Sequence, residues 1–323
     1  MSDIAMIEAA AGRMAGHIRR TPLLSAPLLD RLVGRRVLVK AECLQWTGSF
    51  KARGGWSAIS ALPEEQRTRG VLAMSSGNHA QGVARAAAAH GVKAVIVMPA
   101  DAPESKAKNT RAYGAEVVTY DRSKDDRDAI AAELAKARGL TLVKPFDNEE
   151  VIAGQATVGL EIAEQAREAG VAEAPVLVPC GGGGLSAGMA LAFEAKAPGL
   201  KVRPVEPAGF DDMARSLAAH EILRNERTAG SICDAILTPA PGELTFPVLD
   251  RLAGPGLVVS DDQALQAMAL AFEHLKIVLE PGGAVALAAA LFAPDLPETV
   301  ICVASGGNVD AGRFSEALER FAR

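Results

Sequence analysis

One lysine, Lys51, stands where a short turn meets a helix-like segment in ECLQWTGSFKARGGW, residues 42–56. A lysine whose amine is buried loses its proton more easily than usual and can then act as a nucleophile or a general base. A lone lysine is more often a solvated surface charge. Its chemistry therefore depends on which other groups the fold brings beside it.

Three glycine-bearing loops each follow an apolar run that predicts a β-strand. They are SSGNH (75–79) after VLAM, GGGGLSAG (181–188) after VLVPC, and SGGNVD (305–310) after TVICVA. In open parallel sheets, ligands bind beyond the carboxyl ends of the strands, where such loops converge. We therefore expect the three loops to line one ligand site.

The glycine run at 181–184 predicts an anion site, because residues without a Cβ let an anion approach the backbone and the following helix offers free N–H groups. It is not a P-loop, since no Gly-Lys-Ser/Thr follows at the required spacing. Gly182, Gly184 and Ala187 satisfy the loose GxGxxA dinucleotide pattern, and Glu206 lies near the end of the next expected strand. A nicotinamide oxidoreductase and a tight turn that only packs its glycines are therefore open alternatives.

The SSGNH loop supplies two hydroxyls, an amide and an imidazole at the expected start of a helix. Donors in this arrangement can hold a carboxylate. The same residues could equally form an N-terminal cap, and His79 could be a structural hydrogen-bonding residue rather than a base.

The loop EPAGFDD, residues 206–212, brings Glu206 and Asp212 close together in the sequence. Two carboxylates and a backbone carbonyl would form an oxygen site for Mg²⁺ or Ca²⁺. A solvated acidic loop is the alternative.

The elements that must position these groups follow an alternating pattern. Short apolar runs separated by alanine-rich amphipathic segments predict βαβ units, hence a doubly wound α/β fold with mostly parallel sheets. We expect a small α/β domain at 67–144 and a larger one formed by 1–66 with 145–323. Within the larger one, a helix is expected near 156–168, and Ser260 and Gln263 have capping-box spacing.

The composition excludes several classes of function. The chain has 323 residues, 49% hydrophobic and 23% charged, with a net charge of -5, so it has no basic field for nucleic acid. No run reaches the roughly 18 apolar residues needed to cross a bilayer, and no signal peptide is evident, so we expect no membrane partner and a cytoplasmic location. The four cysteines lie far apart without CxxC spacing and are interpreted as reduced and mostly buried.

Taken together and in this order, TGSFKARGG, SSGNHAQG, GGGGLSAG and SGGNVD strongly resemble the fold type II pyridoxal-phosphate (PLP) enzymes, the tryptophan synthase β-like fold. Within them the chain resembles the serine/threonine dehydratase and serine racemase group over nearly its whole length. The resemblance favours PLP over a dinucleotide. The residues it implies for cofactor binding are Lys51, as the covalent attachment point, with Phe50, Asn78, Gly181, Gly182, Gly183, Gly184 and Ser305.

The resemblance also implies a reaction. Lys51, displaced by the substrate amine, would take the Cα proton, and loss of the β-hydroxyl would lead to a 2-oxo acid and ammonia. Ser76 would serve the opposite face of the substrate and allow some racemisation. A substrate-binding loop is implied at Ser75, Ser76, Gly77, Asn78 and His79.

Two further features follow from the resemblance alone. The acidic loop matches a cation site whose ligands are Glu206, Asp212 and the carbonyl of Phe210, for Mg²⁺ or else Ca²⁺ or Mn²⁺. A homodimer is expected, acting on a small amino acid.

The substrate is less well specified. Phe146 in KPFDN resembles an apolar wall of the threonine/serine dehydratases, whereas Arg127 falls near an arginine that could bind a second substrate carboxylate. We therefore predict a 3-hydroxy-amino-acid dehydratase acting on L-threonine or L-serine, with 3-hydroxyaspartate dehydratase or serine racemase as alternatives. A PLP or amino-acid binding protein without turnover is a further alternative. Trp46 departs from the family pattern, and its role is left open.

Overall fold

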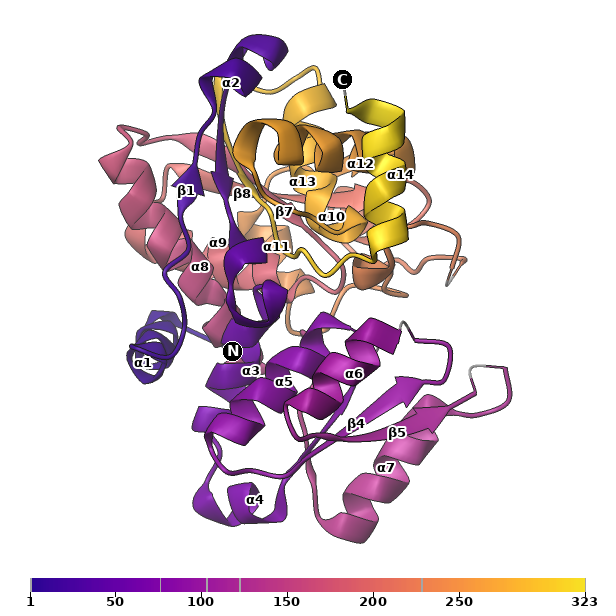
Figure 1. Cartoon of the computed structure of the whole chain (residues 1–323). Coiled ribbons are helices and arrows are strands. Elements are labelled where there is room, and N and C mark those ends of the chain that lie inside the picture. The colour runs from indigo at the N-terminus through magenta and orange to yellow at the C-terminus, as the bar shows by residue number, and fades with distance from the viewer. Residues whose placement is uncertain (1, 76, 103, 122, 228, 323) are drawn as a thin grey trace.

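The computed structural model describes residues 2–75, 77–102, 104–121, 123–227 and 229–322. Two β-sheets, each wrapped by helices, form two lobes that meet at helices α3 (Lys51–Ser60) and α5 (Asn78–Ala89) (Figure 1). The larger lobe carries both the first helix, α1 (Ile4–Met14), and the last, α14 (Ala311–Phe321). This confirms the predicted α/β class with mostly parallel sheets.

The larger sheet has six strands in the order β1-β2-β10-β7-β8-β9, and only the β1–β2 pair is antiparallel. Its strands are β1 (Leu23–Leu24), β2 (Arg36–Lys40), β7 (Ala174–Pro179), β8 (Leu200–Pro207), β9 (Leu257–Val259) and β10 (Thr299–Val303). The smaller sheet, in the order β5-β4-β3-β6, is wholly parallel. Its strands are β3 (Val71–Met74), β4 (Ala94–Pro99), β5 (Glu116–Tyr120) and β6 (Thr141–Leu142).

Helices cover both faces of each sheet, as parallel strands require. The helices of the smaller lobe and of the junction are α3 (Lys51–Ser60), α4 (Glu64–Arg69), α5 (Asn78–Ala89), α6 (Glu104–Ala112) and α7 (Arg127–Arg138). Those of the larger lobe are α1 (Ile4–Met14), α2 (Pro27–Val33), α8 (Glu149–Glu168), α9 (Gly184–Lys196), α10 (Asp212–Ala219), α11 (Phe246–Leu252), α12 (Asp261–Leu270), α13 (Pro281–Phe292) and α14 (Ala311–Phe321). Short helical turns complete the chain at η1 (Glu42–Leu44), η2 (Trp46–Gly48), η3 (Asp234–Ile236) and η4 (Ala271–Leu275).

Local signals explain where two of these helices begin. The side chain of Asn148 accepts a hydrogen bond from the Val151 N–H, so α8 begins at Glu149, earlier than the expected start near 156. The predicted capping box at Ser260 and Gln263 is confirmed at the start of α12.

The hydrophobic core lies on both faces of the larger sheet. Along β7, Val176 and Val178 pack in one apolar cluster with α8 and α9, whereas Leu177 packs in the other with α12 and α13. Successive residues of a strand point to opposite faces, so a continuous apolar run is what a strand buried on both sides needs.

Helices α3 and α5 cross at backbone contact. A methyl group on Gly82 would come within 2.6 Å of the Lys51 carbonyl oxygen, and one on Gly55 within 2.7 Å of the Gly82 backbone. Only glycine permits this approach. The helix that begins with Lys51 and the helix that begins with Asn78 are therefore packed as one unit.

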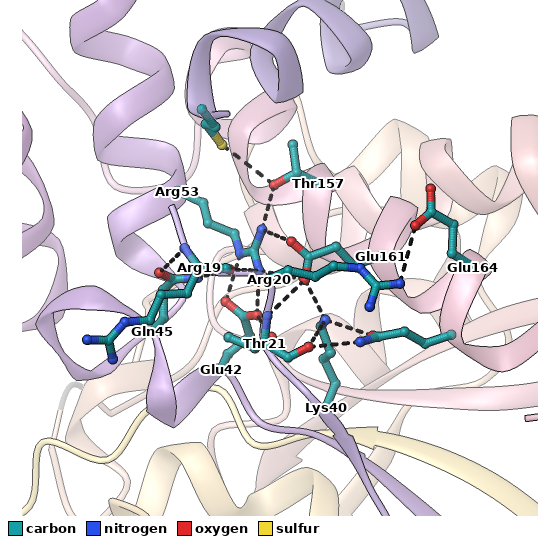
Figure 2. Close-up of polar contacts among 12 residues, drawn as sticks. Arg19, Arg20, Thr21, Lys40, Glu42, Gln45, Arg53, Thr157, Glu161 and Glu164 are labelled. Atoms are coloured by element: carbon teal, nitrogen blue, oxygen red, sulfur yellow. Dashed lines mark hydrogen bonds and ion pairs between the residues drawn. The ribbon is translucent and has the colours of Figure 1, made fainter. Parts of the chain in front are cut away.

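A buried charge network, here the Arg53 network, joins α3 to the larger lobe (Figure 2). It consists of Arg53, Glu42, Glu161 and Lys40. The Arg53 guanidinium donates to Glu42 at 2.8 Å and to Glu161 at 2.8 Å, and Lys40 also donates to Glu161. Burial alone would raise the pKa of Glu42, but the adjacent Arg53 outweighs it and holds that pKa below its ordinary value. The two positive and two negative charges balance inside the protein.

No helix in the described part of the chain is long and apolar enough to cross a membrane. All four cysteines are free and buried. The strands of the smaller sheet run from Val71 to Leu142, and the division into domains at 67 and 144 stays a prediction.

Candidate active site

The carboxyl ends of strands from both sheets converge on one cavity of about 500 Å³ between the two lobes. In the larger sheet, β7 and β10 are neighbours. The polypeptide leaves β7 on one face of the sheet and β10 on the other, which makes a topological switch point between these strands. In the smaller sheet, β3 and β6 are likewise neighbours, and their carboxyl ends lie at the same edge. The predicted residues that line the cavity are Phe50, Lys51, Ser75, Gly77, Asn78, His79, Arg127, Gly181, Gly182, Gly183, Gly184 and Ser305, with Phe146. The predicted Ser76 lies outside the described residues.

Lys51 begins α3 and points its amine into this cavity. Its Nζ donates to the carbonyl oxygen of Pro145 at 2.8 Å, just beyond β6, and lies 5.0 Å from the centre of the Phe50 ring. Burial lowers the pKa of Lys51 from 10.5 to about 8. No carboxylate pairs with this amine among the described residues, so it can become neutral near physiological pH and act as a nucleophile or base.

We expect the lowered pKa of Lys51 to be measurable in the protein without cofactor. The neutral amine reacts with cyanate, so carbamylation of Lys51 should reach half its maximal rate near pH 8, well below the pH of about 10.4 expected for a free lysine side chain. The unfolded chain keeps this proton up to about pH 10.5, so the stability penalty is full below pH 8 and fades as pH rises from 8 to 10.5. Peptide mass spectrometry would follow the modification of Lys51. A rate that still rises steeply above pH 10, as for a free lysine side chain, would contradict the buried amine.

The SSGNH loop joins β3 to α5. The Ser75 hydroxyl accepts a hydrogen bond from the Gly77 N–H at 3.1 Å. The His79 ring donates through Nε2 to the carbonyl of Val143 at 2.9 Å, because a carbonyl can only accept. Burial and the nearby Lys51 lower the pKa of His79 to about 3, so the ring is neutral. Its Nδ1 is then an acceptor, and it has no hydrogen-bond partner among the described residues. A substrate carboxylate would therefore meet the backbone N–H groups at the start of α5 rather than this ring.

Glu280 is a site residue that the sequence reasoning missed. It is buried beside Asn78, whose amide nitrogen donates to its carboxylate, and it lines the same cavity. Burial raises the pKa of Glu280 to about 7. A lone acidic residue within the apolar run IVLEPGGAV was the signal that could have found it, since buried acids are rare without a partner.

The glycine loop fits a phosphate group. Gly183, at φ +90°, forms the N-terminal cap of α9, and this left-handed conformation favours glycine. A methyl group on Gly182 would meet the Phe146 ring at 2.3 Å, so Phe146 covers the loop. The hydroxyl of Thr238, beside Gly181, is buried with no hydrogen-bond partner among the described residues. Free helix N–H groups, a close backbone and an unsatisfied hydroxyl are the donors that a phosphate needs.

Two positively charged side chains line the part of the cavity that the smaller lobe forms. Arg127, at the start of α7, lines the cavity, but its side chain is 50% exposed and pairs with Asp128. Lys106 on α6 was not predicted. It is 7% exposed, lies against Gly77 and pairs with Asp234 at 3.3 Å.

The acidic loop lies apart from the cavity lining. The Glu206 carboxylate accepts from the N–H groups of Met213 and Ala214, and Asp212 accepts from the Asn225 amide at 2.6 Å. The second oxygen of Asp212 is buried with no hydrogen-bond partner among the described residues. Within the described ranges, no group of three or more His, Cys, Asp or Glu side chains is placed to hold a metal ion.

Comparison with known proteins gives consistent results. Residues 14–306 match the family described as pyridoxal-phosphate dependent enzyme. The chain is 39% identical to a serine racemase of Oryza sativa subsp. indica, covering 98% of this chain and 94% of that protein. It is 40% identical to an L-threo-3-hydroxyaspartate ammonia-lyase of Pseudomonas sp, covering 96% of each. Among solved structures, a threonine deaminase from T.th. matches with a TM-score of 0.90 and 48% identity, over 95% of this chain and 99% of that one.

Proposed function

Because the chain belongs to the pyridoxal-phosphate dependent enzyme family, and within it to the serine/threonine dehydratase and racemase group, we propose that it is a dehydratase of 3-hydroxy amino acids. Its first proposed substrates are L-threonine and L-serine, converted to a 2-oxo acid and ammonia. The observation that supports this reading is the buried Lys51 amine in a cavity that the glycine loop at 181–184 also lines. Family membership sets aside the dinucleotide alternative.

Residues of both sheets would hold the cofactor. Lys51 would attach it covalently, the 181–184 loop and Thr238 would bind its phosphate, and Asn78 would donate to the oxygen on its ring. The Ser305 hydroxyl, on the loop after β10, would face the ring nitrogen as a neutral partner. PLP supplies an electron sink that weakens the bonds at Cα of a bound amino acid.

The chain's own groups would carry out the proton transfers. Once released, the Lys51 amine loses its proton more easily than an ordinary lysine because burial lowers its pKa to about 8, and its neutral form would take the Cα proton. The N–H groups at the start of α5 would hold the substrate carboxylate. The β-hydroxyl would leave as water by taking up one proton, which balances the proton that Lys51 removes from Cα. Hydrolysis of the product returns that water and releases ammonia, so the net reaction converts threonine to a 2-oxo acid and ammonia.

The direct test measures the visible absorbance of the PLP-loaded protein and then the release of 2-oxo acid and ammonia. The substrates are L-threonine, L-serine and both diastereomers of L-3-hydroxyaspartate, each added separately. Release from one or more of them is the expected result. A protein that binds PLP yet releases ammonia from none would be a binding protein, and one that binds no PLP would contradict the proposal.

The buried Lys106 favours 3-hydroxyaspartate as a second candidate substrate. The Lys106 ammonium, held beside Gly77 and Asp234, is placed to pair with a carboxylate in the cavity. A dicarboxylic substrate such as 3-hydroxyaspartate has one more carboxylate than threonine has. Arg127 is the other candidate for this contact, but it is half exposed.

We expect Lys106→Met to raise the KM for 3-hydroxyaspartate about tenfold or more and to change that for threonine by much less, since a buried charge-assisted hydrogen bond is lost. Steady-state kinetics on both substrates would measure this. Arg127→Met is the matched control and should have a smaller effect. Equal losses with both substrates would instead place Lys106 at the carboxylate that all of them share.

Racemisation is proposed as a side activity through Ser76, which lies outside the described residues. Appearance of D-serine from L-serine, and its loss in Ser76→Ala with elimination retained, would support this role.

A divalent cation is proposed at Glu206, Asp212 and the Phe210 carbonyl, because the second oxygen of Asp212 needs a partner. We expect Mg²⁺ at 100 times its dissociation constant to stabilise the protein by about 2.7 kcal/mol, and chelation to reverse this. Thermal unfolding with Mg²⁺, Ca²⁺, Mn²⁺ or chelator would measure the effect. Asp212→Asn should remove it, and a shift that persists in this variant would place the ion elsewhere.

We further propose that the enzyme is a homodimer that works in the cytoplasm. The family resemblance supports the dimer, and four free, buried cysteines suit a reducing compartment. Sedimentation equilibrium would test the dimer.

A further inference from the structure

A chain of hydrogen bonds through Asn308 runs from the loop before Lys51 to Glu280. The amide nitrogen of Asn308 donates to the Thr47 carbonyl at 2.7 Å and to the Asn78 amide oxygen at 2.7 Å. The Asn78 amide nitrogen in turn donates to Glu280. This series of hydrogen bonds therefore connects the loops that follow β2, β3 and β10 with the start of α13.

The Thr47 carbonyl determines the donor-to-acceptor direction of every hydrogen bond in this series. An amide side chain can be turned to exchange its oxygen and nitrogen, but a backbone carbonyl can only accept. Asn308 must therefore present its nitrogen to Thr47, which leaves its second N–H for the oxygen of Asn78. The Asn78 nitrogen then faces Glu280, and its remaining N–H is available on the cavity side.

The loop that supplies this carbonyl is firmly held. Thr47 has φ +62°, one of three positive φ values at non-glycine residues in the described part of the chain. The Gly307 N–H donates to the Gly48 carbonyl at 2.9 Å, and a methyl group on Gly48 would meet the Asn308 amide oxygen at 2.6 Å. A backbone conformation of this kind persists only where its surroundings fix it.

We propose that Asn308 is a positioning residue that fixes the orientation of the Asn78 amide, so that Asn78 presents a donor to the cofactor ring and Glu280 is kept as a hydrogen-bond acceptor. This rests on the proposed function, in which Asn78 contacts the cofactor. Without Asn308, the Asn78 amide could turn and present its oxygen, which would repel an oxygen on the ring.

The decisive variant is Asn308→Asp, which keeps the shape of the side chain and removes its two donors. The new carboxylate can only accept, so Asn78 should turn its nitrogen toward position 308 and its oxygen toward Glu280. We expect PLP affinity to fall about tenfold and the absorbance of the bound cofactor to shift. Asn148→Asp is the matched control, because Asp caps α8 as well as Asn does, and it should change neither quantity.

A double variant distinguishes an effect on the orientation of the Asn78 amide from an effect on the stability of the loops alone. In Asn308→Asp with Glu280→Gln, the new amide can donate to the turned Asn78, which restores paired hydrogen bonds in the opposite direction. We expect this variant to regain part of the lost thermal stability without regaining PLP affinity. Recovery of both together, or unchanged PLP affinity in Asn308→Asp, would overturn the proposal.

The unaltered protein without cofactor provides an independent readout. The chain has five asparagines, so selective ¹⁵N labelling gives few side-chain amide signals. The Asn308 amide hydrogens should exchange with solvent much more slowly than those of the exposed Asn109, and equal rates would overturn the proposal even if no variant folds. Failure of the proposed function would show differently, as absence of Lys51-dependent PLP binding in the unaltered protein.

Discussion

Lys51→Met is expected to reduce ammonia release by about 10³-fold or more with every substrate, because the substitution removes both the covalent attachment and the base. Methionine has nearly the same length, so the packing of α3 against α5 is retained. The variant should be at least as stable as the parent at neutral pH, since a buried amine is replaced by an apolar group. Assays at saturating PLP and denaturant unfolding would measure the two effects.

The control for this variant is a lysine outside the cavity. Lys201→Met removes an exposed charge and should leave activity within a factor of two. Residual turnover in Lys51→Met at more than a few per cent of the parent rate would mean that another group removes the Cα proton. Lys106, also on the cavity wall, would then be examined.

Arg53→Met is expected to lower the free energy of unfolding by about 3–5 kcal/mol, because Glu42 is left fully buried without its cation. Glu161 loses the same partner but keeps Lys40. Denaturant titration would measure the change from the shift in midpoint at constant slope. Arg20→Met is the matched control, since Arg20 is 49% exposed beside Glu164 and should cost less than about 1 kcal/mol.

A second variant tests the physical reason. Arg53→Met combined with Glu42→Gln removes both charges and should be more stable than Arg53→Met alone, because the uncompensated carboxylate is gone. A double variant that loses the sum of the two single effects would show that the charges act independently.

The convergence of the three glycine-bearing loops was predictable because parallel sheets gather the loops after their strands at one edge. The cavity is lined by residues of all three loops, namely Ser75 and 77–79, the glycines at 181–184, and Ser305. The direction of individual hydrogen bonds was not predictable. The partner of Lys51 is the carbonyl of Pro145, and a backbone oxygen carries no signal in the residue types.

Contacts between distant segments were the other limit. Glu42 and Glu161 lie far apart in the sequence, and nothing in either segment indicates that Arg53 joins them. Trp46 is similar, because its ring lies 3.9 Å from the Arg19 guanidinium, a contact that only the fold creates. The start of α8 was different, since Asn148 followed by two acidic residues is a helix-start signal that the expected start near 156 overlooked.

Helix α3 is held on two sides, by the Arg53 network against the larger lobe and by the glycine contact of Gly55 with Gly82 on α5. Lys51 and Asn78 therefore cannot separate without breaking buried contacts, whereas Lys106 on α6 and Arg127 on α7 take no part in either of these contacts. The part of the cavity lined by Lys51 and Asn78 is therefore rigid, whereas the part lined by Lys106 and Arg127 can change its side chains. Substitutions that retune substrate preference can thus accumulate on α6 and α7 in evolution, or be introduced by design, while cofactor binding is preserved.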